Sequence, residues 1–183
     1  MSNQRVAQRY ASALMALTGE QKKPEAIAVD LLTVLNVVDA SRELRSVLAS
    51  PIISKEKKRA ILRDVFEKKV GEMVLMYLDV MTNKGRENIL HDILKQYFVL
   101  RDVELGIVRV NVTASVDFSS KQEKSLQKQL ETMTKKKVIV TFSIGKSVKG
   151  GFIARVGDTV LDGSVKHQLE VLKKKLKEGS LNN

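Results

Sequence analysis

The chain has 183 residues, contains no cysteine and carries a formal net charge of +11 at pH 7. This length is enough for one domain or for two small ones with buried cores. The lack of cysteine excludes disulfides, thiolate metal sites and cysteine nucleophiles, and no segment approaches the roughly 18 apolar residues that cross a membrane.

Residues 1–105 repeat apolar side chains at the three- and four-residue spacing of amphipathic helices. Short polar breaks interrupt this spacing, and several segments open with a residue that suits a helix start, such as Pro24, Ser41 and Ser54. The last of these helices is expected to end near Glu104. We therefore predict that residues 1–105 form an N-terminal domain, a six-helix bundle.

The first predicted helix is rich in alanine, whereas the fifth bears a stripe of larger apolar residues. Small side chains on one helix leave room beside large ones on another, which favours a groove for an amphipathic partner helix. The predicted groove is lined by Tyr10, Ala13, Leu14 and Leu17 on the first helix and by Val70, Val74, Tyr77 and Met81 on the fifth. The alternative interpretation is that these side chains only seal the core of the bundle.

Charge is distributed unevenly along the chain. Residues 1–105 contain 17 Lys and Arg against 14 Asp and Glu, whereas residues 106–183 contain 15 against 7. A basic C-terminal part indicates an acidic partner surface, a nucleic acid or an anionic membrane face. The alternative is a solvated, lysine-rich surface.

In the fourth predicted helix the basic residues, Lys58 among them, are expected to face solvent.

At Gly106 the apolar period changes from that of helices to the alternation of strands. Ser120 and Glu123 are expected to form a capping box that opens a helix, and a second strand starts near Val138. With the segments that follow, the order is β-α-β-β-β-α. The expected fold class is α+β, in which the helical bundle precedes a small C-terminal α/β domain of residues 106–183 with a short sheet and two helices.

Short groups of glycine and aspartate separate the apolar runs between positions 150 and 164. Glycine tolerates positive φ and aspartate can hydrogen-bond its own backbone, so the pair at 157–158 indicates a chain reversal. The trio at 162–164 closes the hairpin and supplies an N-cap oxygen for the next helix. The predicted structural turn residues are Gly151, Gly157, Asp158, Asp162, Gly163 and Ser164.

The last predicted helix carries an apolar stripe that starts at Val165 and recurs at spacings of four, three and four residues, with lysines beside it. A stripe with a basic rim favours binding to another helix, in which apolar anchors supply most of the affinity. The residues expected to contact this partner are Leu169, Leu172, Lys173 and Leu176.

No motif for catalysis survives inspection. Gly145-Lys146-Ser147 resembles the end of a phosphate-binding loop, but Val140 stands where that motif requires glycine. His91 and His167 have no serine or acidic partner at a useful spacing, which favours surface or capping roles. We therefore expect no catalytic residue, no cofactor, no metal site and no enzymatic activity.

The C-terminal string resembles the delta subunit of F-type ATP synthase, the oligomycin-sensitivity-conferring protein family. The family pattern is a Gly-Gly pair, an apolar strand, Gly-Asp-x-x-x-Asp-Gly-Ser, and a helix that begins with Gln-Leu. The residues that carry it are Gly150, Gly151, Gly157, Asp158, Asp162, Gly163, Ser164, Gln168 and Leu169. Weaker matches at Arg9-Tyr10-Ala11, at Ser50-Pro51 and at Arg86 precede it in order.

The resemblance implies a non-catalytic adaptor at the top of the peripheral stalk of the rotary ATP synthase. Such an adaptor resists the rotor's torque and so couples proton transport to ATP synthesis. The resemblance implies one copy per complex, peripheral to the membrane on the cytoplasmic face of the bacterial inner membrane. The groove would bind N-terminal helices of the head's alpha subunits, and the last helix would bind the b-type subunits of the stator stalk.

Two other classes of protein remain as alternatives. A basic RNA- or ribosome-associated protein would be favoured by aromatic residues on a basic sheet. The strands offer only Phe118, Phe142 and Phe152 nearby, and the last two are expected to fill the core. A small enzyme lacks a catalytic constellation in this sequence. Nucleic acid is therefore not the expected partner.

Overall fold

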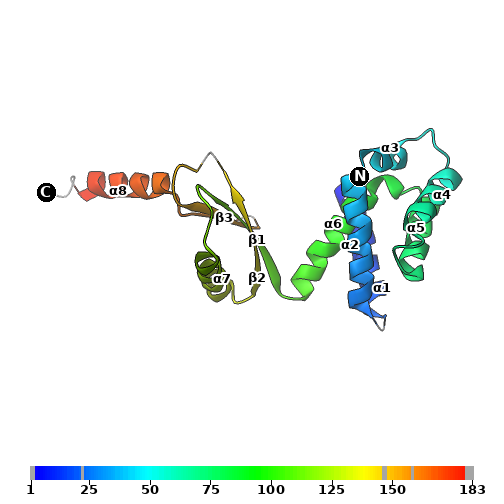
Figure 1. Ribbon diagram of the computed structural model, residues 1–183, viewed down its shortest axis with the longest axis horizontal. Coiled ribbons are helices and arrows are strands. Elements are labelled where there is room, and N and C mark those ends of the chain that lie inside the picture. Colours follow the sequence, from blue (N-terminus) through cyan, green and yellow to red (C-terminus); the bar gives the residue numbers. More distant parts are fainter. Residues whose placement is uncertain (1–2, 22, 146–147, 158, 180–183) are drawn as a thin grey trace. The chain divides into compact units, whose positions relative to one another are not determined.

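The computed structural model of the protein (Figure 1) describes four stretches of the chain, namely residues 3–21, 23–145, 148–157 and 159–179. The chain divides into two compact units, and the boundary between them falls between Arg101 and Asp102. The described residues contain eight α-helices, one 3-10 helix and one four-stranded sheet, which confirms the α+β class.

The first unit is helical (Figure 1). Two of its helices begin at a serine that caps them: Ser41 Oγ accepts a hydrogen bond from Leu44 N at 3.1 Å, and Ser54 Oγ accepts one from Lys57 N at 3.4 Å. The elements are α1 (Asn3–Gly19), α2 (Pro24–Ala40), α3 (Arg42–Ala49), α4 (Lys55–Phe66), α5 (Glu72–Asn83), the 3-10 helix η1 (Glu87–Ile89) and α6 (Leu90–Glu104).

A single apolar core holds these helices together. Its largest fully buried side chains are Tyr97 on α6 and Phe66 on α4, packed with Leu14 of α1 and Leu31 of α2. The Tyr97 hydroxyl lies 3.4 Å from Thr18 Oγ1, so its polar end is satisfied inside the core. The core therefore draws on helices distant in sequence.

The expectation that Lys58 faces solvent is wrong. Its ammonium group is buried and donates hydrogen bonds to Glu87 Oε1 at 2.7 Å and to Leu48 O at 2.8 Å. Burial of a charge is tolerated where it is paired and hydrogen-bonded. These bonds join α4 to the end of α3 and to η1. Helical spacing could not reveal either partner, because Leu48 is 10 positions and Glu87 is 29 positions from Lys58.

Asp79 joins α5 to α4 through two arginines. Its carboxylate accepts hydrogen bonds from Arg59 Nε at 2.8 Å and Arg59 Nη2 at 2.9 Å, and from Arg63 Nε at 3.2 Å. These bonds, those from Arg63 first and those from Arg59 second, hold the pKa of Asp79 well below its usual range. The carboxylate is largely buried whereas both guanidinium groups are about half exposed.

Replacement of Asp79 by asparagine is expected to lower the free energy of unfolding near pH 7 by about 1–2 kcal/mol. The effect is modest because water around the half-exposed arginines screens the interaction. A carboxyl group whose pKa is lowered by folding stabilises the fold above its unfolded pKa of about 3.9, and this contribution is lost as pH falls further. The difference between the two proteins should thus be constant from pH 5 to 7 and shrink below about pH 4. Urea unfolding followed by circular dichroism measures it; a difference independent of pH would contradict the ion-pair origin.

The second unit is a four-stranded sheet with one helix packed against it (Figure 1). The strand order is β2-β1-β3-β4, in which β1 pairs parallel with β2 and antiparallel with β3, and β3 pairs antiparallel with β4. The observed element order agrees with the predicted β-α-β-β-β-α. The elements are β1 (Ile107–Ala114), α7 (Ser120–Thr134), β2 (Lys137–Ile144), β3 (Phe152–Val156), β4 (Thr159–Asp162) and α8 (Val165–Gly179).

One face of this sheet forms the core of the second unit. Alternate residues of β1, including Val110 and Val112, are fully buried and pack with Leu126 and Leu130 of α7. The three nearby aromatic rings also pack in this core, because Phe118 lies 5.2 Å from Phe142 and 6.0 Å from Phe152 between ring centroids. The phenylalanines therefore stabilise the fold instead of forming a stacking surface for bases.

The helix α7 does begin with a capping box, one residue earlier than predicted. Ser119 Oγ accepts from Gln122 N at 3.4 Å, and Gln122 Oε1 accepts from Ser119 N at 2.9 Å. The prediction of Ser120 and Glu123 is wrong because glutamine serves as well as glutamate at the third helical position, and two serines in a row leave the choice open.

Candidate protein-binding surfaces

The residues predicted to line a groove fall into two groups in the structure. The side chains of Leu14, Val74 and Met81 are 0% exposed and belong to the core. Val70 and Tyr77 are also buried. On α1, by contrast, Tyr10 is half-buried and both Ala13 and Leu17 are exposed. A partner can therefore reach three of the four predicted α1 residues, whereas Leu14 and all four residues predicted on the fifth helix are buried. Val70 also lies before the start of α5, not on it as predicted.

The exposed apolar residues of α5 were missed by the sequence analysis. Met76 is 54% exposed and Val80 is 50% exposed. Met76 follows the half-buried Met73 by three positions, and Val80 follows Tyr77 by three. These four residues follow the i, i+3, i+4, i+7 spacing of a single helix face, so the sequence does contain a signal for them. The sequence analysis chose the neighbouring apolar face of the same helix, which belongs to the core.

The exposed apolar residues of α1 and of α5 lie on helices that share one core. Tyr10, half-buried on α1, and Tyr77, buried on α5, both pack in this core, and the Tyr10 phenol contributes to the raised pKa of Tyr77. We call this surface the α1–α5 face; it consists of Tyr10, Ala13 and Leu17 on α1 and of Met73, Met76, Tyr77 and Val80 on α5. It has the two-helix form and the apolar anchors of a site for a third helix.

Two hollows flank α1. One has a volume of about 360 Å³ and is lined by Arg5, Val6, Arg9, Tyr10, Ala13 and Arg86. It adjoins the α1–α5 face, with which it shares Tyr10 and Ala13. The other, of about 240 Å³, lies between α1 and α6 and includes Ala7 and Val99. Both hollows are open to solvent.

The hydroxyl of Tyr77 is the most unusual polar group of the α1–α5 face. It is buried and has no hydrogen-bond partner among the residues that the structure describes. Burial raises the pKa of Tyr77, and the neighbouring Tyr10 phenol acts in the same direction. A buried hydroxyl without a partner is costly, so a polar group from a bound protein would stabilise it.

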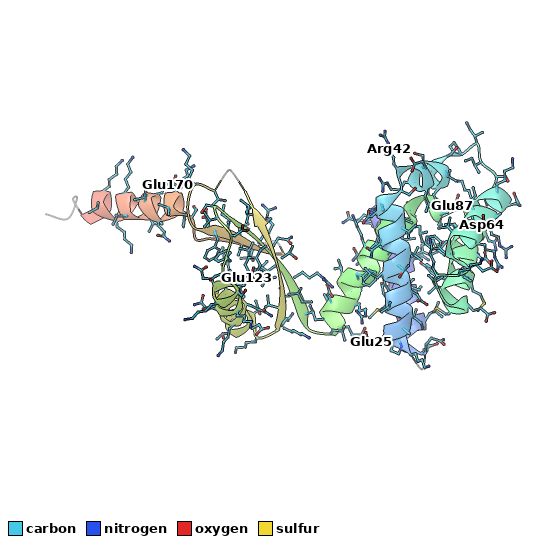
Figure 2. All side chains as sticks on the ribbon, in the orientation of Figure 1. Glu25, Arg42, Asp64, Glu87, Glu123 and Glu170 are labelled. Atoms are coloured by element: carbon cyan, nitrogen blue, oxygen red, sulfur yellow. The ribbon has the colours of Figure 1, made fainter. Side chains whose placement is uncertain are left out.

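The four residues predicted to bind a partner through the last helix lie together on α8. Leu169, Leu172 and Leu176 are between 53% and 66% exposed, and with two lysines they line a shallow hollow of about 370 Å³. Side chains project from all sides of α8, including that of Glu170, with no other helix or strand of the described part of the second unit packed along it (Figure 2). An isolated helix of this length is only marginally stable in water, so the exposed stripe favours a partner.

The junction between the hairpin and α8 is tightly hydrogen-bonded. Asp162 Oδ1 accepts from Ser164 N at 2.8 Å, and Ser164 Oγ accepts from His167 N at 3.2 Å as the cap of α8. Val165 N donates to Gly150 O at 3.0 Å. The hydrogen bonds from Ser164 lower the pKa of Asp162.

Two glycines of the predicted turns have positive φ, +78° at Gly151 and +56° at Gly157. At Gly151 a Cβ atom would also lie 2.3 Å from the carbonyl oxygen of Gly163, so only glycine fits there. Asp158, which was predicted to act in the same turn, lies outside the described residues.

The histidine expected to lack an acidic partner has one. His91 Nε2 lies 2.6 Å from Asp39 Oδ1, which joins α6 to α2, and its Nδ1 lies 3.3 Å from Asp92 Oδ1. The bond to His91 is the main cause that lowers the pKa of Asp39. No group of three or more His, Asp and Glu within the described stretches is arranged to hold a metal ion.

No helix in the described part of the chain combines the length and the apolar character that crossing a membrane requires.

Each of the two compact units carries exposed apolar residues on its helices. Residues 6–176 match the family described as ATP synthase delta (OSCP) subunit, and the chain belongs to this family. It is a non-catalytic subunit of the peripheral stalk of an F-type ATP synthase. The resemblance inferred from sequence is thereby confirmed.

Similar proteins match over almost their full length. ATP synthase subunit delta of Chloroherpeton thalassium is 37% identical over 177 residues, which is 97% of this chain and 97% of that protein. The subunit of the same name from Chlorobium phaeobacteroides (strain DSM 266) is 38% identical over 176 residues, 96% of this chain and 97% of that one.

Among solved structures, a chain of the cryo-EM structure of the Toxoplasma gondii mitochondrial ATP synthase hexamer has the same fold. Its TM-score is 0.71, with 21% identity, over 93% of this chain and 96% of that chain.

Proposed function

We propose that the protein joins the catalytic head of the ATP synthase to its stator stalk through one surface on each unit. The α1–α5 face binds N-terminal helices of the head's alpha subunits, and the apolar stripe of α8 binds the end of the b-type stalk subunits. One copy serves each complex, on the cytoplasmic face of the bacterial inner membrane. The link resists the torque of the rotor, and torque resistance couples proton transport to ATP synthesis.

We also propose that the two partners bind two domains, a six-helix bundle of residues 1–105 and an α/β domain of residues 106–183. The observation that carries the proposal is the position of the exposed apolar residues. Those of the α1–α5 face and those of α8 lie in different compact units with separate cores. Two partners can then bind the chain without competing for the same surface.

RNA binding has no comparable support. The aromatic rings near the sheet pack against one another in the core, and the family match extends over residues 6–176. The positive charge of the second unit then serves the protein partner, where it steers association more than it adds affinity.

Reconstitution tests the proposed function. The full chain is mixed with the purified head, with a soluble segment from the end of the b-type subunit, or with both, and the products are separated by size-exclusion chromatography. We expect two binary complexes and one ternary complex that contains all partners. Competition between the head and the stalk segment for the chain would contradict binding at separate surfaces.

Replacement of Val80 by aspartate tests the α1–α5 face directly. Because Val80 is half exposed, the fold should survive, whereas a charge beside the apolar anchors of a bound helix should weaken head binding about tenfold or more. Isothermal titration calorimetry with an N-terminal alpha-subunit peptide measures the affinity.

Ile52 provides the matched control for Val80. It is 92% exposed and lies in the loop between α3 and α4, so its replacement by aspartate adds the same charge away from the face. Equal affinities for the two variants would remove Val80 from the interface. Aspartate at Leu14 would be uninformative, because that side chain is fully buried and the change would disrupt the core.

A further inference from the structure

The hollow beside the N-terminal half of α1 concentrates positive charge. It is lined by Arg5, Arg9 and Arg86, together with Val6, Tyr10 and Ala13, and has no acidic residue in its wall. Across the described stretches, five arginines have a guanidinium group with no hydrogen bond or ion pair, namely Arg5, Arg9, Arg42, Arg86 and Arg155. Three of these five meet in this one hollow.

Local electrostatics oppose this arrangement. The helix α1 contains no aspartate or glutamate. Arg5 and Arg9 are four positions apart, where like charges on a helix repel, and both lie in the half of α1 nearest its positive N-terminal end. An anionic group in the hollow would remove both penalties, so the three arginines form a site for an anion.

The remaining wall of the hollow indicates what carries this anion. Val6, Tyr10 and Ala13 are apolar or largely apolar, and Tyr10 and Ala13 continue into the α1–α5 face. On the same face, the buried Tyr77 hydroxyl has no partner among the described residues. A free inorganic anion would leave the apolar wall uncovered, whereas a carboxylate on an amphipathic helix would cover that wall and neutralise the arginines.

We propose that this arginine pocket, formed by Arg5, Arg9 and Arg86 around Tyr10, receives an acidic side chain of the helix bound on the α1–α5 face. Guanidinium groups suit this role because their planar donors bind a carboxylate through two parallel hydrogen bonds. The pocket lies at one end of the face, so it sets the direction and register of the bound helix. This inference rests on the proposed head binding and adds the chemistry of the contact.

A double-mutant experiment on the full chain tests the pocket. The probe is a fluorescent synthetic peptide with the N-terminal sequence of the alpha subunit from the same ATP synthase, and anisotropy reports binding. The protein variants are Arg9→Gln, Arg86→Gln and, as the matched control, Arg42→Gln, which removes an equally unpaired, exposed arginine from α3 (Figure 2). Each aspartate and glutamate of the peptide is also replaced, one at a time, by asparagine or glutamine.

We expect Arg9→Gln and Arg86→Gln each to weaken binding about three- to tenfold, and Arg42→Gln to leave it unchanged. One peptide substitution should cause a similar loss, and combining it with Arg9→Gln should add little, since the two groups act as a pair. Circular dichroism should show the same helix content for all variants, because the three side chains are exposed.

Three results would overturn the inference. Unchanged binding by Arg9→Gln and Arg86→Gln, with the original peptide still bound, would remove the arginine pocket but leave head binding intact. Equal losses for Arg42→Gln would show that only net charge matters. No binding of the peptide to the unaltered chain would overturn both the pocket and the proposed head-binding function.

Discussion

Replacement of Gly151 by alanine is expected to destabilise the second unit by roughly 2–4 kcal/mol, because the added Cβ meets the closest backbone atom found at any described glycine. The new Cβ would lie 2.3 Å from the Gly163 carbonyl oxygen and 3.1 Å from the Cα atom of Ser164. Both are backbone atoms, which cannot rotate away. The positive φ of +78° adds the strain of a left-handed conformation to this clash.

The loss of stability should extend beyond the hairpin, because Gly151 and its neighbour Gly150 accept hydrogen bonds from two other segments of the second unit. Its carbonyl oxygen accepts from Ser115 N at 3.3 Å at the end of β1, and the preceding Gly150 accepts from Val165 N at the start of α8. Urea unfolding followed by circular dichroism measures the stability, and hydrogen exchange at Ser115 and Val165 locates the change.

Gly157 supplies a matched control in the same hairpin. Its φ is +56°, but nothing lies within 4 Å of the position that a Cβ would occupy. Alanine there meets backbone strain without a clash and should cost only about 1 kcal/mol. Equal losses at both positions would show that strain alone matters and that the approach of Gly151 to Gly163 is not tight.

Much of the fold could be predicted because local signals dominate it. The change of period at Gly106 and the caps at Ser41 and Ser54 depend on near neighbours in sequence. The order of strands in the sheet could not be predicted in the same way. The parallel pairing of β1 with β2 and the antiparallel pairing of β1 with β3 depend on how α7 packs against one face of the sheet. The sequence of any one segment does not contain this information.

The two candidate surfaces differ in how well the sequence predicts them. On α8 no other described element of the second unit covers the apolar stripe, so spacing alone identified Leu169, Leu172 and Leu176 as available to a partner. On α5 the neighbouring helices decide which stripe is covered, and the stronger stripe around Val74 is the buried one. Lys58 shows the same limit, since its partner Glu87 comes from a distant segment.

Replacement of Leu172 by aspartate is expected to abolish stalk binding, with an affinity loss of about 30-fold or more. Leu172 is 53% exposed at the centre of the α8 stripe, between Leu169 and Leu176. A bound helix would bury these three side chains together, and a carboxylate among them would lose its water without gaining a partner. Surface plasmon resonance against the end segment of the b-type subunit measures the affinity and both rate constants.

Lysine at the rim should act differently from leucine at the centre. Replacement of Lys173 by alanine removes one exposed charge, whose pairing with an acidic partner is worth little at physiological salt. The association rate should fall at low salt, while the dissociation rate stays nearly constant. Met133 on α7, 66% exposed, gives the control for adding a charge elsewhere in the unit, and Met133→Asp should bind normally. If Lys173→Ala abolished binding while Leu172→Asp and the milder Leu172→Ala had no effect, charge and not apolar contact would hold the stalk.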